Sequence, residues 1–145
     1  MKALLQRVSS GSVSVEGKPI ATIAKGLVIL VGIGHADSST QAQAMAEKVA
    51  TLRIFEDDAG KMNLSILDTH GSALVVPQFT LYADTRKGRR PAFTDAAIPD
   101  IAKRLVDVFI RELQDKGIPT RNGEFGAHMS VEIINDGPVT IMIEL

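Results

Sequence analysis

One run of residues, GLVILVGIG (26–34), constrains the fold of this chain more than any other segment. It is apolar throughout, is bounded by glycines and is rich in β-branched residues, and it is far shorter than the roughly 20 residues that cross a bilayer. A strand with one face in water would alternate polar and apolar residues, whereas a strand covered on both faces has this uninterrupted pattern. We therefore expect a strand here, at the centre of the core.

Two other segments have the apolar periodicity of amphipathic helices. The apolar positions are Ala42, Met45, Ala46, Val49 and Leu52 in the first, and Ile101, Leu105, Val108, Phe109 and Leu113 in the second. Ser38 and Gln41 have the spacing of a capping box, so we expect the first helix over residues 39–55. We expect the second helix to begin at Pro99 and to end at Gly117.

Most of the remaining segments have the patterns of strands. Strands are predicted over residues 2–8, 12–16, 62–66, 72–81, 131–133 and 139–145, with a hairpin tip at Asp136-Gly137 between the last two. Short turns join many of them, which favours antiparallel pairing. The expected fold is one mixed α/β domain over residues 1–145, in which mostly antiparallel sheets form a barrel-like core with two packed helices.

Composition excludes several classes of function. Sixteen basic and seventeen acidic residues give a formal net charge of −1, so any nucleic acid must be met by a local basic patch. The three histidines lack metal-ligand spacing and no nucleotide-binding glycine pattern is present, so we expect no metal and no cofactor. With no cysteine, a polar first segment and no apolar run of membrane-spanning length, a cytoplasmic protein is expected.

Two polar segments each allow two interpretations. PQFTL (77–81) follows an apolar run with the amide of Gln78, the ring of Phe79 and the hydroxyl of Thr80. These groups either line a pocket or finish a core strand in which Phe79 is buried. RKGRR (86–90) places four cations in a loop, which either contact phosphates or form a solvated charged loop.

The combination of segments resembles a known family. VVPQFTLYADTRKGRRPAF, NDGPVTI, RIFEDDAGKMNLS and GEFGAHMSVEIINDGPVT are together similar to the D-aminoacyl-tRNA deacylases, small dimeric enzymes that free tRNA from wrongly attached D-amino acids. The likeness runs from ALLQRV to the last predicted strand. The family motif Ser-Gln-x-x-Leu is matched except that Pro77 replaces the serine, as it does in a related branch that removes L-alanine from mischarged tRNA.

This resemblance implies how the enzyme rejects L-amino acids. Gly137 and Pro138 should form a cis peptide that projects from one subunit of a homodimer into the active site of the other. Their backbone oxygens would occupy the space of an L side chain, while a D side chain points outward and glycine is not excluded. Arg7 matches a family arginine that orients this element; without the resemblance, Arg7 would be interpreted as an exposed residue of an edge strand.

The resemblance also assigns the hydrolytic and tRNA-binding residues. Gln78, Phe79 and Thr80 would be the catalytic residues, with backbone N–H groups near Phe79 and Thr80 stabilising the developing oxyanion. Thr80 either orients a water molecule or acts as a nucleophile, although no base for it is evident in the motifs. The remaining matches contact tRNA: Phe125 borders the terminal adenosine or belongs to the core, and the acceptor-stem phosphates meet Arg86, Lys87, Arg89 and Arg90.

Four functions remain open at this point. The favoured one is hydrolysis of D-aminoacyl-tRNA and glycyl-tRNA by a homodimer that binds the 3′ end of the tRNA. A related deacylase acting on L-alanyl-tRNA is the first alternative, because of Pro77. The others are a non-catalytic module that binds the tRNA end, and a dimeric structural protein in which NDGPVT only closes the interface.

Overall fold

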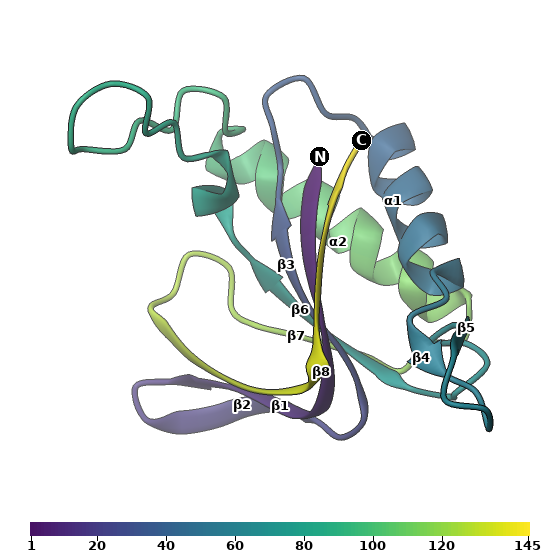
Figure 1. Cartoon of the computed structure of the whole chain (residues 1–145). Coiled ribbons are helices and arrows are strands. Elements are labelled where there is room, and N and C mark those ends of the chain that lie inside the picture. The colour runs from purple at the N-terminus through teal and green to yellow at the C-terminus, as the bar shows by residue number, and fades with distance from the viewer.

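The central apolar run forms β3 (Gly26–Gly32), the middle of a six-stranded sheet. The computed structural model describes residues 1–145. The other elements are β1 (Lys2–Val15), β2 (Lys18–Ile23), α1 (Ser39–Thr51), β4 (Phe55–Glu56), β5 (Met62–Leu64), β6 (Ser72–Pro77), η1 (Phe79–Tyr82), α2 (Pro99–Asp115), β7 (Thr120–Asn122) and β8 (Met129–Glu144). Figure 1 follows them along the chain.

Strand β1 organises the sheet because it pairs with three strands. Its first half pairs with β3 and its second half with β2, while β8 runs antiparallel to it along nearly its whole length. On the far side of β3 the pairs β3–β6 and β6–β7 are parallel, because helices α1 and α2 lie in the connections. β2 also lies against β6 and β7, so the sheet closes most of the way into a barrel.

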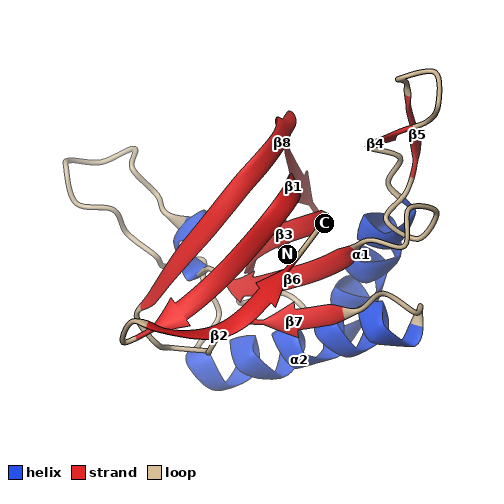
Figure 2. Cartoon of the chain, turned by 90° about the horizontal axis from the view of Figure 1, so that it is seen from below, coloured by secondary structure: helices blue, strands red, loops and turns tan.

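Strand β3 is covered on both faces, as its sequence predicts. Leu27, Ile29 and Val31 belong to the main core under the helices, whereas Val28 belongs to a second apolar cluster. That second cluster fills the inside of the curled sheet and consists of Val8, Val13, Ala21, Ile23, Val28, Leu74 and Val76. Figure 2 shows both helices on the same side of the sheet, so the prediction of a mixed α/β fold with two packed helices is confirmed. Neither helix is long and apolar enough to cross a membrane.

The helix boundaries agree with the sequence except at one end. Ser38 and Gln41 form the predicted capping box, and α2 begins at Pro99 as expected. Helix α1, however, ends at Thr51 and not at residue 55, because Leu52 is extended and the chain turns into β4. The side chain of Arg53 supports this turn by donating to the carbonyl oxygen of Asn63 at 2.6 Å and to its Oδ1 at 2.9 Å.

The predicted hairpin near the C-terminus is wrong. β8 is one long strand whose two halves both pair with β1, with Val8 opposite Asn135 and Gln6 opposite Thr140. Between these pairs the single residue Arg7 faces four residues, so residues 136–139 leave the ladder as a bulge. We call residues 136–139 the β8 bulge. Likewise, the two strands predicted over residues 2–8 and 12–16 form one strand, β1.

Candidate active site

The predicted catalytic segment is a tight turn and not the end of a strand. β6 ends at Pro77, and residues 79–82 form the short helix η1, which corrects the prediction of a strand to residue 81. The N–H of Gln78 donates to the carbonyl oxygen of Val31 at 2.7 Å, and the chain then leaves the sheet. Phe79 is 58% exposed, so the alternative that it is a buried core residue is wrong.

Side-chain contacts hold the η1 turn in place. The ring of Phe79 packs edge-on against Phe93 with centroids 5.0 Å apart. At the other end, the hydroxyl of Tyr82 donates to Oδ2 of Asp37 at 3.4 Å, and burial together with Asp37 raises the pKa of Tyr82, so it stays protonated. Within the turn, Nε2 of Gln78 donates to Oγ1 of Thr80. The Thr80 hydroxyl has no hydrogen bond to a histidine or a carboxylate.

A cavity of about 650 Å³ opens beside this turn. Its walls come from the ends of β3 and β6, the turn itself, the start of α2 and the loop before β8. Gln78, Phe79 and Phe125 all line it, so three residues that the sequence assigned to one site are brought together. Phe125 is partly buried and lies outside both core clusters, which leaves its ring available to the cavity.

The cavity is mostly apolar, as expected for a site that holds a ring or a side chain. Some of its walls carried no signal in the sequence: Phe93, Ala96, Ala97 and Ile98 come from a loop without periodicity. Only the packing of this loop against η1 reveals them. No group of three histidine, aspartate or glutamate side chains is close enough together to hold a metal ion.

Arg7 anchors the β8 bulge from inside the protein. Its side chain donates from Nε to the carbonyl oxygen of Asp136 at 2.9 Å and from Nη1 to the carbonyl oxygen of Ile54 at 2.9 Å. Nη2 pairs with Glu56 at 3.3 Å. Arg7 is only 4% exposed, so its interpretation as an exposed edge residue is wrong.

The β8 bulge is closed by its own side chains. Oδ1 of Asn135 accepts from the N–H of Val139 at 2.8 Å, and Nδ2 of Asn135 donates to Oγ1 of Thr140 at 3.1 Å. The Gly137-Pro138 bond inside the bulge is cis, as the resemblance implies. Gly137 has a φ of 139°, and a Cβ there would lie 2.7 Å from Val139 Cγ2, so only glycine fits without strain.

The bulge and the η1 turn lie at different ends of the sheet. Arg7 pairs with Leu27 of β3, whereas Pro77 pairs with Val31 of the same strand. Four residues of strand separate these positions, which corresponds to about 13 Å. Figure 1 likewise shows η1 and the β4–β5 hairpin on opposite sides of the protein. The hairpin marks the end where the bulge lies, because Arg7, which anchors the bulge, also donates to Ile54 just before β4. One chain therefore does not bring the predicted filter and the predicted catalytic residues together.

The four cations of the loop after η1 are not equivalent. Asp84 and Ala92 exchange backbone hydrogen bonds of 2.8 and 2.9 Å, which closes the loop at its base. Arg86 forms a forked pair with Asp84, with distances of 2.8 and 2.7 Å, and this guanidinium holds the pKa of the Asp84 carboxyl below its usual range. Lys87, Arg89 and Arg90 are exposed and form no ion pair.

Comparison with known sequences identifies the family. The profile described as D-Tyr-tRNA(Tyr) deacylase matches residues 4–144. The chain belongs to this family. D-aminoacyl-tRNA deacylase from Thermomicrobium roseum is 57% identical over 144 residues, covering 99% of this chain and 94% of that protein. The D-aminoacyl-tRNA deacylase of Heliobacterium modesticaldum is 58% identical, with 99% and 96% covered.

Solved structures share the family's fold. A structure described as c-Myc DNA Unwinding Element Binding Protein matches with a TM-score of 0.94 and 38% identity, covering 100% of this chain and 99% of that one. A probable eukaryotic D-amino acid tRNA deacylase matches with a TM-score of 0.87, covering 99% and 98%, at 17% identity. At that identity the second likeness shows the fold alone. The D-Tyr-tRNA(Tyr) deacylase family thus accounts for the whole architecture described above.

Proposed function

We propose that this protein hydrolyses the ester bond of D-aminoacyl-tRNA and of glycyl-tRNA, releasing free tRNA and the amino acid. The observation that carries the proposal is the family match over residues 4–144, to which the curated D-aminoacyl-tRNA deacylases of similar length add 57–58% identity. The cavity beside the η1 turn supports it, because it has room for an aminoacyl group and a base. We place the reaction in the cytoplasm, where aminoacyl-tRNA is used.

The backbone of the η1 turn supplies the oxyanion donors in this mechanism. Water attacks the ester carbonyl, the carbon–oxygen bond to the ribose breaks, and a proton passes from the water to the leaving ribose oxygen. The N–H of Gln78 is already bonded to Val31, and Pro77 has no N–H. The N–H groups of Phe79 and Thr80 are therefore the donors proposed for the negative oxygen, and each such donor contributes on the order of 10²–10³ in rate.

Thr80 orients the attacking water in this proposal. The amide of Gln78 donates to Oγ1 of Thr80, so the hydroxyl hydrogen is free to donate to water or substrate. A nucleophilic threonine needs a base to remove that hydrogen, and neither a histidine nor a carboxylate contacts it. The neighbouring ribose hydroxyl of the tRNA is then the group best placed to assist the water.

The chirality filter requires a second copy of the chain. The β8 bulge lies about 13 Å along the sheet from the η1 turn of its own chain, so the two groups meet only if a partner supplies one of them. We infer a homodimer in which the carbonyl oxygens of Gly137 and Pro138 exclude an L side chain. Arg7 keeps the bulge in place from behind. Glycine, which has no side chain, passes the filter.

The tRNA is held on either side of the reacting ester. Phe125 stacks on the terminal adenosine, an interaction worth about 1–3 kcal/mol. Lys87, Arg89 and Arg90 contact phosphates of the acceptor stem. Arg86 contributes less, because Asp84 already neutralises it.

The decisive experiment compares four substrates. D-tyrosyl-, L-tyrosyl-, glycyl- and L-alanyl-tRNA are incubated with the purified protein, with and without a chelator. We expect fast hydrolysis of the D-tyrosyl and glycyl esters and little hydrolysis of the two L esters. Fast loss of L-alanine would assign the protein to the branch that shares Pro77. Binding without turnover on any of the four would favour the non-catalytic module.

The role of Thr80 is tested by Thr80→Ala. We expect the variant to keep part of its activity on D-tyrosyl-tRNA, because backbone donors and substrate binding remain. The measurement is kcat under saturating substrate, with circular dichroism to show an intact fold. Complete loss of turnover in a folded variant would indicate covalent catalysis by Thr80.

A further inference from the structure

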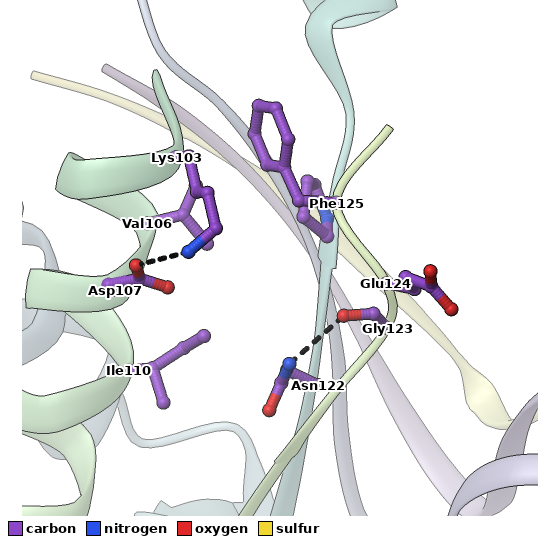
Figure 3. A pocket seen from close by; sticks show the side chains of 9 residues that line it. Lys103, Val106, Asp107, Ile110, Asn122, Gly123, Glu124 and Phe125 are labelled. Carbon is purple, nitrogen blue, oxygen red and sulfur yellow. Dashed lines mark hydrogen bonds and ion pairs between the residues drawn. The ribbon is translucent and has the colours of Figure 1, made fainter. Parts of the chain in front are cut away.

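A second cavity adjoins the candidate active site and has no role in the mechanism above. It has a volume of about 190 Å³ and lies between α2 and the segment after β7 (Figure 3). It shares Pro77, Val106 and Phe125 with the larger cavity. The two cavities are therefore neighbours, with Phe125 in the wall of both.

The small cavity combines apolar surfaces with a polar edge. Pro77, Val106, Ile110 and Phe125 provide apolar contacts. On α2, Nζ of Lys103 and Oδ2 of Asp107 are 2.9 Å apart, and Figure 3 shows this pair facing the cavity across from Asn122. Glu124 lines the cavity mainly with its backbone, since its carboxylate points away in the same view.

This arrangement suits a single pyrimidine ring. The volume lies below the roughly 300 Å³ at which pockets for larger ligands begin, so a base fits better than a whole nucleoside. The ammonium of Lys103 can donate to N3 of cytosine, and the carboxylate of Asp107 beside it can accept from the N4 amino group. An exposed i,i+4 ion pair such as Lys103–Asp107 contributes little to stability, so little is lost when it opens toward a base.

We propose that this cavity binds the base of the cytidine that precedes the terminal adenosine of tRNA, with Lys103 and Asp107 reading its hydrogen-bonding edge. This inference rests on the proposed function, because it takes the terminal adenosine to occupy the larger cavity against Phe125. The nucleotide before it must then leave that cavity next to Phe125. Since every tRNA ends in the sequence CCA, a cytidine site strengthens binding without distinguishing one tRNA from another.

The test uses small esters in place of whole tRNA. D-tyrosyl esters of adenosine, of the dinucleotide CpA and of UpA are compared by their KM and kcat values. One good base contact is worth about 1–3 kcal/mol, so we expect the KM of the CpA ester to be about tenfold lower than that of the adenosine ester, with kcat unchanged. The UpA ester should gain much less.

Two variants decide whether the cavity is responsible. Lys103→Met and Asp107→Ala, which remove the donor and the acceptor, should each abolish the advantage of CpA while leaving hydrolysis of the adenosine ester unchanged. Both side chains are more than half exposed, so neither change threatens the fold. Glu47→Ala is the matched control, because it removes an exposed carboxylate from another ion pair, that with Lys116, away from the cavity. An advantage of CpA that survives in both variants, or its absence in the wild-type protein, would overturn the proposal.

Binding without turnover provides an independent readout. Unacylated CpA and adenosine are titrated into the wild-type protein and into Asp107→Ala by calorimetry. Tighter binding of CpA to the wild-type protein alone supports the cytidine site even if no ester is hydrolysed, in which case only the proposed catalysis fails. Equal binding of the two ligands to the wild-type protein contradicts the cytidine site even if D-tyrosyl-tRNA is a good substrate.

Discussion

The two ends of the sheet use arginine–carboxylate pairs in opposite ways. Arg7 is 4% exposed and is fixed by two backbone carbonyl oxygens as well as by Glu56. The side chain of Arg86 is 84% exposed and contacts only Asp84 of its own loop. The first pair orders backbone from three segments, whereas the second only shapes a surface turn. This difference in burial fits the proposed roles of the two ends, a rigid one for the steric filter and an adaptable one for tRNA.

The largest expected loss of stability is that of Gly26→Ala, at the end of the sheet where Arg7 is buried. Gly26 pairs with Val8, next to Arg7, and a Cβ at position 26 would lie 1.8 Å from the carbonyl oxygen of Ser72. Backbone atoms cannot yield as a flexible side chain does, so we expect a loss of about 4 kcal/mol or more in the free energy of unfolding. Urea denaturation measures it. Gly88→Ala, in the exposed loop, is the comparison: no atom lies near a new Cβ, so only the strain of its left-handed φ of 70° remains, which costs about 1–2 kcal/mol. An equal loss at the two positions would contradict this account.

The direct comparison replaces each arginine by leucine. Arg7→Leu leaves the carbonyl oxygens of Ile54 and Asp136 without their donor, so we expect a loss of about 3 kcal/mol in the free energy of unfolding. Arg86→Leu should change it by less than about 1 kcal/mol, because exposed ion pairs contribute little. Arg7→Lys should restore only part of the loss, since one ammonium cannot reach both carbonyl oxygens as the guanidinium does. A stable Arg7→Leu protein that still rejected L-tyrosyl-tRNA would remove Arg7 from the proposed filter.

Salt dependence distinguishes the loop cations from one another. Replacing Lys87, Arg89 or Arg90 by glutamine should reduce the slope of log K for tRNA against log salt by about one for each phosphate that the variant no longer neutralises. Arg86→Gln should reduce it less, because its guanidinium is already paired with Asp84. The measurement is tRNA binding at several salt concentrations. Equal slopes for all four variants would mean that the Asp84 pair opens when tRNA binds.

The smallest expected effect is an acid dependence of the loop pair. Arg86 lowers the pKa of the Asp84 carboxyl in the folded protein, so the pair stabilises the fold above the ordinary aspartate pKa of about 3.9. The stabilisation is lost as pH falls below that value toward the folded pKa. Because the pair is exposed, the effect should be slight. The melting temperature of Asp84→Asn should therefore fall slightly less than that of the wild-type protein between about pH 4 and pH 2, and an identical decline would show that the pair does not stabilise the fold.

Periodicity predicts the parts of this fold that depend on local sequence. The apolar run at 26–34, the capping box of Ser38 and the stripe of α2 were sufficient for the central strand and both helices. The β8 bulge was predicted as a hairpin tip, because Asp136-Gly137 suits a turn and only the register against β1 shows that the strand continues. The η1 turn was missed for a similar reason: Phe79 leaves the sheet and packs against Phe93, which belongs to a loop without periodicity.

The candidate site was accessible to sequence reasoning mainly through motifs. Gln78, Phe79 and Phe125 were placed in one site by resemblance, and they line one cavity. No pattern could have indicated that Arg7 bonds to Ile54, because the contact spans 47 positions and uses a backbone oxygen that any residue would supply. The walls of the small cavity were equally hidden, since Lys103 and Asp107 look in the sequence like ordinary polar residues of an amphipathic helix.

The pairing of β1 with β8 also has a consequence for how the protein matures during synthesis. Lys2 pairs with Glu144 and Val15 with Met129, so the first strand to leave the ribosome waits for the last one before its second edge is covered. β1 can pair with β2 and β3 early, but contacts between distant parts of a chain form slowly. Until β8 arrives, β1 presents an open edge that invites pairing with other nascent chains. Assembly of the β8 bulge, and with it any filtering of substrates, is therefore among the last events in the maturation of this protein.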